Sequence, residues 1–213
     1  NFILVLSHDE VVHLKCSMLG KMPGDKDDKF ANLKLAYAYM SGHPGKKLLF
    51  MGQEFGQWNE WSEKKALDWY LLEDPSHKEL KEFTKACMML NKKYKCLYET
   101  DYSPEGFRWI NANDRDNSVF SFIRISPDKK RHLLFVLNFT PVERMHHRIG
   151  VPIKGKYKLV LGDDLKNQKK TLTSIHGECD GYKDSLLIDL HRYGIAVYEF
   201  NGDVNAHKPT KIS

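Results

Sequence analysis

The sequence of 213 residues contains no apolar run long enough to cross a membrane. A membrane-spanning helix needs roughly 18 or more consecutive apolar residues, and every apolar run here is far shorter. No basic stretch followed by an apolar stretch, the pattern of a secretory leader, precedes the first apolar segment. We therefore expect a soluble, cytoplasmic protein. Because position 1 is Asn, we also expect the natural chain to begin further upstream.

Cysteine is scarce, and its spacing excludes the usual metal and disulfide patterns. The four cysteines (Cys16, Cys87, Cys96 and Cys179) form no C-x-x-C pair. Reduced thiols in a cytoplasmic protein are the simplest interpretation. We find no internal repeat, and a composition of 41% hydrophobic and 12% aromatic residues excludes wholesale disorder.

Charge of one sign is not concentrated anywhere in the chain. The formal net charge is +5, and the basic residues are scattered among acidic ones apart from short clusters at 129–131 and 169–170. Such clusters are typical of solvated turns. We therefore expect no nucleic-acid partner.

What the sequence does have is an apolar run that leads directly into polar, ionisable residues. Residues 2–6 are apolar without alternation, which is typical of a strand covered on both faces of a parallel sheet. Ser7, His8, Asp9 and Glu10 follow at once. Loops after the carboxyl ends of such strands carry active sites, so the pattern indicates a catalytic loop. The alternative is a solvated acidic turn at a strand end.

A helix and a second apolar strand are predicted next. The spacing of Phe30, Leu33, Tyr37 and Met40 places them on one helix face, with Asp27 or Asp28 as the expected cap. Glycine and proline at 42–45 end this helix, and residues 47–52 form another apolar run. Strand, helix and strand together are the repeating unit of a parallel sheet.

The loop after this second run mixes aromatic rings with carboxylates and amides. It includes Glu54, Trp58 and Trp61, and Trp69 follows shortly after. Flat rings beside polar groups suit the apolar face and hydroxyls of a sugar. The alternative is that these tryptophans only pack the loop. A capping-box pattern from Ser76 to Glu79 then predicts a helix that ends near residue 95.

Beyond residue 106 the hydrophobic period changes to two, which predicts short strands. Seven of them are expected, at 107–110, 119–125, 133–139, 148–151, 156–161, 186–190 and 195–200. Closely spaced short strands predict an antiparallel sandwich. Residues 163–184 are expected to form a long loop with at most one short strand. We place the boundary between two domains at residue 100, which gives 1–100 and 101–213.

Two parallel strands with one crossover cannot cover their own apolar surface. Burial of each side chain in residues 2–6 is worth ~1.5–3 kcal/mol, so leaving five exposed forfeits on the order of 10 kcal/mol, as much as the stability of a whole domain. Either upstream residues or another chain must complete this sheet. We therefore expect the isolated chain to self-associate through residues 2–6 and 47–52.

The motifs together resemble a known family. The stretches 6–13, 21–25 and 43–58, extended by 67–69, 104–110 and 136–142, resemble the C-terminal part of the 1,4-α-glucan (glycogen) branching enzymes of the α-amylase clan. The resemblance covers roughly residues 2–200. It departs at Leu14, where the family usually has Gly, and at Gln53, where it often has Gly or Asn.

This resemblance implies a fold class of α/β plus all-β. The first region would be the last two strand-helix units of a (β/α)8 TIM barrel, strands 7 and 8, and an antiparallel β-sandwich C-terminal domain would follow. It also implies a retaining mechanism with a covalent glycosyl-enzyme. The glucan chain then passes to the 6-hydroxyl of an α-1,4-glucan such as glycogen or amylose, without metal or organic cofactor.

The resemblance places the nucleophilic Asp and the acid Glu upstream of Asn1, so the isolated chain is expected to be inactive. It assigns catalytic roles to Asp9, the third carboxylate, and to His8, both of which hold sugar hydroxyls. Glu10, Glu54, Trp58 and Trp61 are expected to contact the glucan. The alternatives are an α-glucan hydrolase of the same clan and a non-catalytic carbohydrate-binding fragment.

Overall fold

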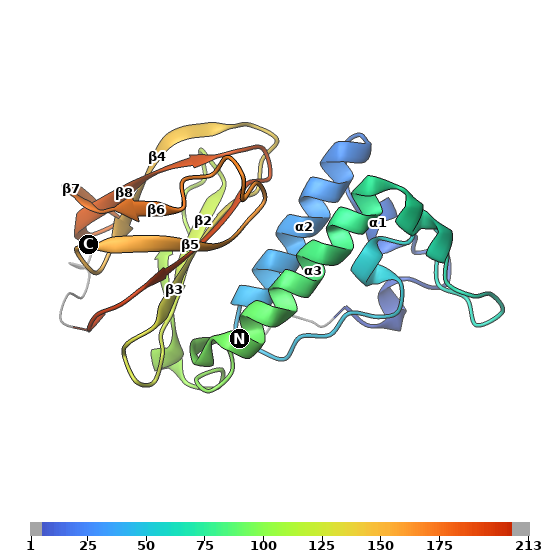
Figure 1. Cartoon of the computed structure of the whole chain (residues 1–213), viewed down its shortest axis with the longest axis horizontal. Helices are drawn as coiled ribbons and strands as arrows, with labels where there is room; N and C mark the ends of the chain where they lie inside the picture. Colours follow the sequence, from blue (N-terminus) through green and yellow to red (C-terminus); the bar gives the residue numbers. More distant parts are fainter. Residues whose placement is uncertain (1–5, 206–213) are drawn as a thin grey trace. The chain divides into compact units, whose positions relative to one another are not determined.

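The computed structural model describes residues 6–205 and divides the chain into two compact units (Figure 1). Unit 1 is Asn1–Met89 and unit 2 is Leu90–Ser213. The boundary at residue 100 expected from the sequence stays a prediction. Of the predicted first strand, residues 2–5 lie outside the described part of the chain.

Unit 1 is built from helices and short helical turns. Its elements are the 3-10 turns η1 (His8–Glu10), η2 (Gln53–Phe55) and η3 (Trp69–Glu73) and the helices α1 (Met18–Lys21), α2 (Lys26–Gly42) and most of α3 (Pro75–Lys93). Within residues 6–205, no helix combines the length and the apolar character that crossing a membrane requires.

Helix α2 buries the predicted face but begins with a different cap. Phe30, Leu33 and Tyr37 are buried as expected. The cap is Asp25, whose carboxylate accepts a hydrogen bond from the amide of Asp28 at 2.9 Å, so the prediction of Asp27 or Asp28 was wrong. Asp25 has the extended backbone that an N-cap requires, whereas residues 26–42 already lie within the helix.

Helix α3 likewise begins earlier than its capping-box pattern predicted. The carboxylate of Asp74 accepts the amide of Ser76 at 2.9 Å, and Pro75 opens the helix. Proline suits this position because its missing N–H would have no partner in the first turn. Hydrogen bonds from Lys26 and from the Ser76 amide lower the pKa of Asp74 to about 2. Ser76 is therefore not the cap.

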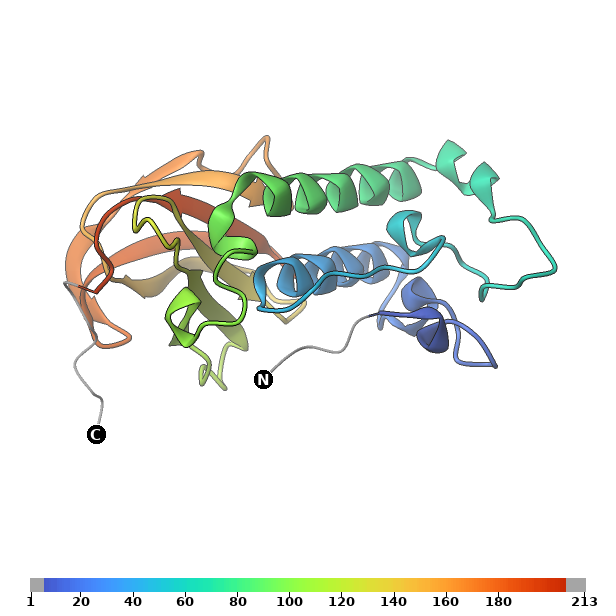
Figure 2. The same cartoon turned by 90° about the horizontal axis from the view of Figure 1, so that it is seen from below.

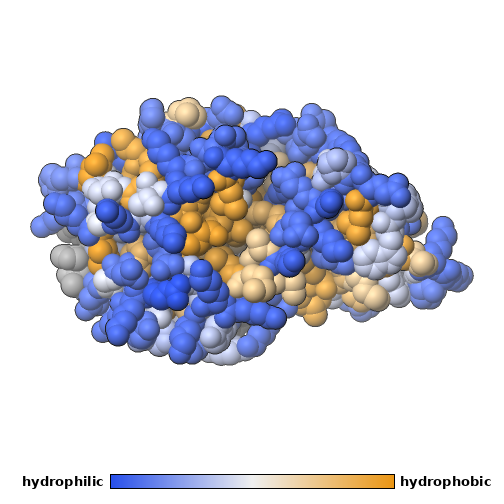
Figure 3. Space-filling model, viewed as in Figure 1, coloured by the Kyte–Doolittle hydropathy of each residue, from blue (hydrophilic) through white to orange (hydrophobic). Residues whose placement is uncertain are grey.

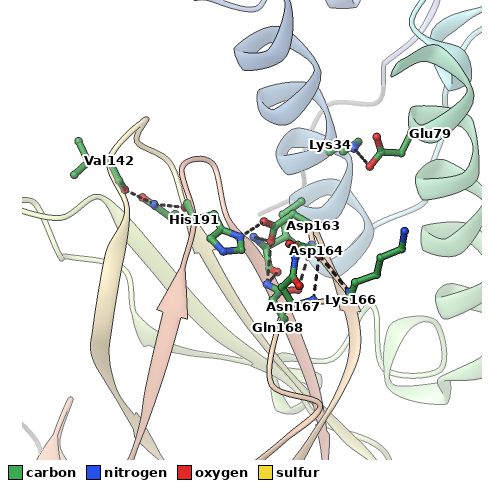
Figure 4. Close-up of polar contacts among 11 residues, drawn as sticks. Lys34, Glu79, Val142, Asp163, Asp164, Lys166, Asn167, Gln168 and His191 are labelled. Carbon is green, nitrogen blue, oxygen red and sulfur yellow. Dashed lines mark hydrogen bonds and ion pairs between the residues drawn. The ribbon is translucent and has the colours of Figure 1, made fainter. Parts of the chain in front are cut away.

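Helices α2 and α3 lie side by side and run in the same direction (Figures 1 and 2). Lys34 of α2 forms an ion pair with Glu79 of α3 at 2.9 Å (Figure 4). Two turns further along both helices, the Ser41 side chain hydrogen-bonds to Cys87. Burial raises the pKa of this thiol to about 12. All four cysteines are free thiols, in agreement with the sequence.

The predicted second strand at 47–52 is not formed, and that prediction was wrong as stated. One parallel bridge joins Leu6 to Leu49, and a strand requires a ladder of such pairings. The side chains of Leu48 and Met51 are 42% and 50% exposed. Figure 3 shows one face of the molecule, on which hydrophobic areas are visible between hydrophilic residues.

Unit 2 is an antiparallel β-sandwich, as predicted. The larger sheet has the order β1-β2-β3-β9-β5-β6 and the smaller β4-β8-β7 (Figures 1 and 2). The strands are β1 (Phe107–Asn111), β2 (Val119–Arg124), β3 (His132–Asn138), β4 (Arg144–Val151), β5 (Lys156–Gly162), β6 (Thr171–Thr173), β7 (Ile175–Cys179), β8 (Tyr182–Leu190) and β9 (Ile195–Phe200). Alternate residues such as Leu134, Val136, Leu186 and Ile188 form the core.

The expected long loop at 163–184 is instead ordered. Two strands, β6 and β7, and the start of β8 lie within it, so that prediction was wrong. Asp163 anchors its beginning: its carboxylate accepts the Ile195 amide at 2.7 Å and the Gln168 side-chain amide at 3.0 Å, and it lies 3.0 Å from His191 Nδ1 (Figure 4). The polar composition of this segment favoured a loop, but its polar side chains hydrogen-bond to one another and to the backbone.

The largest fully buried side chain of the described residues is that of Arg124. Its guanidinium donates to Asp101 at 2.6 Å, with the two side chains 0% and 3% exposed. Its Nε also donates to the carbonyl of Gly106 at 3.3 Å. The end of β2 thus holds the irregular segment that precedes β1.

We predict that Asp101→Asn lowers the free energy of unfolding by ~3–5 kcal/mol, because it leaves a buried guanidinium without its counter-charge. Urea denaturation followed by circular dichroism measures this change. Asp116→Asn, at an exposed carboxylate in the same unit, is the matched control and should change stability little. Equal, small effects of the two substitutions would contradict the prediction.

The imidazole of His132 is buried and neutral, and both of its nitrogens form hydrogen bonds. Its Nδ1 accepts the amide of Ser126 at 3.1 Å, and its Nε2 therefore carries the proton donated to the carbonyl of Gly202 at 2.8 Å. Burial lowers the pKa of this imidazole, and it also lowers that of His147. The unfolded chain consequently binds protons at these positions more readily than the folded chain does.

We predict that the contribution of His132 to the free energy of unfolding is fully present above pH ~6.5, the ordinary histidine pKa. This contribution is lost as the pH falls from there through the folded-state pKa of His132. The melting temperature between pH 7.5 and 5.5 should therefore fall less in His132→Gln than in the wild type. His176→Gln, at an exposed side chain, serves as control. An unchanged pH dependence in His132→Gln would contradict the prediction.

Candidate functional site

The segment of His8, Asp9 and Glu10 folds as the single 3-10 turn η1. The Ser7 side chain caps it by accepting the amide of Asp9 at 3.3 Å, and the amide of Val11 closes it on the carbonyl of His8 at 2.9 Å. His8 Nε2 lies 3.2 Å from Asp9 Oδ1, and both side chains are more than half exposed. The turn thus presents an imidazole and a carboxylate together.

Two lysines hold the backbone of this turn. Lys15 Nζ donates to the carbonyl of Asp9 at 2.8 Å. Lys21 Nζ donates to the carbonyl of Glu10 and lies 3.6 Å from the Glu10 carboxylate. The carboxylate of Glu10 is therefore already paired with a cation. Within the described residues, the polar contacts of the Asp9 carboxylate are those with His8 and Ser7.

The second loop begins with a turn between two glycines. Gly52 and Gly56 have φ values of 87° and 71°, and the turn η2 lies between them. Glu54 Oε2 accepts the amide of Gly52 at 2.9 Å. The Tyr37 hydroxyl donates to the carbonyl of Gln53 at 2.8 Å. Burial and, to a smaller extent, the negative charge of Glu54 raise the pKa of Tyr37.

The two loops meet near residues 60 and 61. The amide of Trp61 donates to the carbonyl of Val11 at 3.0 Å, and the Glu60 carboxylate accepts the amides of Leu14 and Cys16. A row of rings links the same loops, because Phe50 lies 5.9 Å from the His8 ring and 5.1 Å from the Trp61 ring.

A small pocket lies between these loops, with a volume of about 10 Å³, which suffices for about one water molecule. Val11, Gln53 and Trp61 are among its lining residues. Gln53 is only 3% exposed, yet its side-chain amide has no hydrogen-bond partner in the described part of the chain. Buried amides are normally paired, so Gln53 marks a place where a polar partner is expected.

The predicted site residues do not all gather at this place. His8, Asp9 and Glu10 lie on one turn, and Trp61 adjoins them through Phe50. Trp58 instead contacts Phe30 and His77 edge-on, while Glu54 closes its own turn onto the amide of Gly52. Their predicted contact with a glucan stays a prediction.

Sequence reasoning missed Glu60 and Lys15. Their roles arise from contacts with loop backbone, which local patterns do not reveal. The sequence offered one signal of an unusual backbone in this loop. Leu14 stands where the family that the motifs resemble usually has glycine, and its φ is 64°. As for metals, the described residues contain no group of three or more His, Cys, Asp or Glu side chains arranged to hold an ion.

Comparison with known proteins agrees with the motifs. Residues 109–201 match the family described as alpha amylase, C-terminal all-beta domain. The chain is 49% identical over 208 residues to the 1,4-alpha-glucan branching enzyme GlgB of Butyrivibrio fibrisolvens, covering 94% of this chain and 32% of that protein. It is 51% identical over 166 residues to the enzyme of the same name from Aquifex aeolicus, covering 78% and 26%.

A third relative, from Thiobacillus denitrificans, has the same name and is 52% identical over 164 residues, 77% of this chain and 22% of that protein. These matches confirm the resemblance that the motifs indicated. The chain spans less than a third of the length of these curated relatives.

We predict that Glu54→Ala lowers the free energy of unfolding by ~1.5–3 kcal/mol, the worth of a hydrogen bond to a charged group. Glu54→Gln should cost less because its carbonyl oxygen can still accept the Gly52 amide. Denaturation followed by tryptophan fluorescence reports mainly on this unit, since Trp58, Trp61 and Trp69 lie in it and Trp109 alone lies in unit 2. Full stability of Glu54→Ala would contradict the structural role.

Proposed function

We propose that this chain is the C-terminal portion of a 1,4-alpha-glucan branching enzyme, because its sequence is similar to those of the enzymes with that name. In this proposal, residues up to about 100 contribute strands 7 and 8 of a (β/α)8 barrel. The parallel bridge between Leu6 and Leu49 and the parallel helices α2 and α3 support it. So do the exposed side chains of Leu48 and Met51, which upstream strands would cover.

The whole protein would transfer an α-1,4-glucan chain to a 6-hydroxyl and form an α-1,6 branch. A retaining mechanism needs a nucleophilic carboxylate, an acid and groups that stabilise the charged transition state. We assign the first two to residues upstream of Asn1. The third comes from this chain, and the exposed pair of His8 and Asp9 on one capped turn is the observation that carries the assignment.

Asp9 has the chemistry to hold sugar hydroxyls as positive charge develops on the ring. Its carboxylate is 67% exposed, and no lysine or arginine side chain forms an ion pair with it among the described residues. Lys15 takes the backbone carbonyl of Asp9 instead of its carboxylate. Charge-assisted hydrogen bonds that tighten in the transition state accelerate the reaction selectively. His8, at 3.2 Å, would hold the same sugar.

The remaining residues would extend the substrate site. Trp61 offers a ring beside the pocket that Gln53 lines, and Glu10, Glu54 and Trp58 complete the proposed set. No metal or organic cofactor takes part in this proposal. Cytoplasmic location and self-association of the isolated chain stay predictions.

In the full-length protein, Asp9→Asn should lower turnover about a hundred- to a thousand-fold, or ~2.7–4 kcal/mol, as loss of other preorganised electrostatic groups does. Substrate binding should change modestly because the amide keeps the size of the side chain. His8→Ala should cost less, since the imidazole contributes hydrogen bonds and not the negative charge of a carboxylate. Iodine absorbance of amylose measures branching. Asp27→Asn, at an exposed carboxylate, is the control.

A folded Asp9→Asn enzyme with wild-type turnover would remove Asp9 from the catalytic residues. Circular dichroism and the melting temperature on the same preparation separate this outcome from unfolding. A purely structural role for Asp9 would lower the melting temperature and leave turnover per folded molecule unchanged.

The 213-residue chain alone should neither branch nor hydrolyse amylose, because two of the three carboxylates that the mechanism needs are not in it. Iodine absorbance and reducing ends measured after long incubation test this expectation. Activity that survives purification and disappears in Asp9→Asn would show that the chain carries its own nucleophile and acid.

A further inference from the structure

We propose that Glu60 is a positioning residue, which fixes the loop of residues 13–16 and, through Lys15, the turn that carries Asp9. The inference rests on the proposed function, because it gives the position of Asp9 a catalytic meaning. Within residues 6–205, the hydrogen bonds of the Glu60 carboxylate come from backbone amides, so Glu60 acts through other residues.

Both oxygens of the Glu60 carboxylate are engaged by the same loop. Oε2 accepts the amide of Leu14 at 3.1 Å, and Oε1 accepts the amide of Cys16 at 2.6 Å. These residues are 46 and 44 positions away in the sequence. Because each amide binds a different oxygen of one rigid, planar group, the carboxylate fixes the separation and direction of two points on the loop.

The loop needs this support because its backbone is unfavourable for its residues. His13, Leu14 and Cys16 have φ values of 58°, 64° and 64°, in the left-handed region. Residues other than glycine persist there only when their surroundings hold them. Leu14 is 95% exposed and Cys16 is exposed, so side-chain packing does not supply the restraint. The hydrogen bonds that the amides of Leu14 and Cys16 donate to Glu60 supply this restraint.

Lys15 lies between the two residues that Glu60 holds. Its ammonium donates to the carbonyl of Asp9 at 2.8 Å. Fixing Leu14 and Cys16 therefore fixes the backbone origin of Lys15, and with it the direction from which Asp9 is held. Glu60 is fixed in turn, because the amide of its neighbour Trp61 donates to the carbonyl of Val11 at 3.0 Å.

Leu14 makes the need for Glu60 testable. Glycine adopts positive φ at no steric cost. The leucine side chain has almost no contacts to lose. Replacing it with glycine therefore removes the local strain without creating a cavity, and it should reduce the dependence of the loop on Glu60.

The experiment compares Glu60→Ala, Glu60→Gln, Leu14→Gly and the double variant Leu14→Gly with Glu60→Ala. Glu63→Ala, at an exposed glutamate three residues further on, is the matched control. Branching of amylose in the full-length protein gives kcat and KM for each. Amide hydrogen exchange at Leu14 and Cys16, together with the melting temperature, reports on the loop and on the fold.

In Glu60→Ala, kcat should fall by up to about a hundred-fold, the effect of an approximately 1 Å misplacement of a reacting group, while KM changes much less. Exchange at Leu14 and Cys16 should accelerate about tenfold or more, since each loses a bond to a charged acceptor. Glu60→Gln keeps one oxygen and should lie between. Leu14→Gly should reduce the loss caused by Glu60→Ala, and Glu63→Ala should match the wild type.

An active wild type with unchanged kcat in a folded Glu60→Ala variant would overturn the positioning role alone. So would a loss that appears in KM only, or a loss undiminished in the Leu14→Gly background. An inactive full-length wild type would overturn the proposed function and this inference with it. If Glu60→Ala does not fold, the other variants provide the test. The inference would then be overturned if Glu60→Gln has the kcat and the amide exchange rates of the wild type and Leu14→Gly changes neither quantity.

Discussion

A buried guanidinium constrains the entry into unit 2. The Arg124 side chain has no exposed surface, so protein groups must supply its counter-charge and its hydrogen-bond acceptors. Asp101 supplies the charge, and the carbonyl of Gly106 accepts both from Arg124 and from the amide of Ile125. A Cβ at Gly106 would lie 2.3 Å from the carbonyl oxygen of Thr100, so glycine is required. These contacts together restrain the irregular segment that leads into the sandwich.

The sequence predicted what depends on periodicity and missed what depends on partners distant in sequence. Alternation identified the sandwich, and helical spacing identified α2 and α3. The caps were wrong because Asp25 and Asp74 each had a similar rival close by, at Asp28 and Ser76, and only the backbone direction decides between such candidates. Strands β6 and β7 were missed because their short segments lack apolar alternation and are stabilised by pairing with β5 and β8.

The same division holds for the candidate site. His8, Asp9 and Glu10 could be selected from their place after an apolar run, and the aromatic loop from its composition. Neither pattern indicates that Glu54 turns back onto the amide of Gly52 or that Trp58 packs against Phe30. The link between the loops depends on Glu60 and Trp61, whose partners lie more than forty residues earlier. Such a link becomes visible only when the folded backbone is known.

The position of β9 has a consequence for biosynthesis. This strand is the last one in the described residues, yet it lies between β3 and β5 and pairs with both. While the polypeptide emerges from the ribosome, β3 and β5 therefore remain with open edges until residue 200 has been translated. Open edges of apolar strands recruit other chains. A premature stop codon at Ile195 would thus leave the larger sheet as two incomplete halves, although only 19 of the 213 residues would be missing.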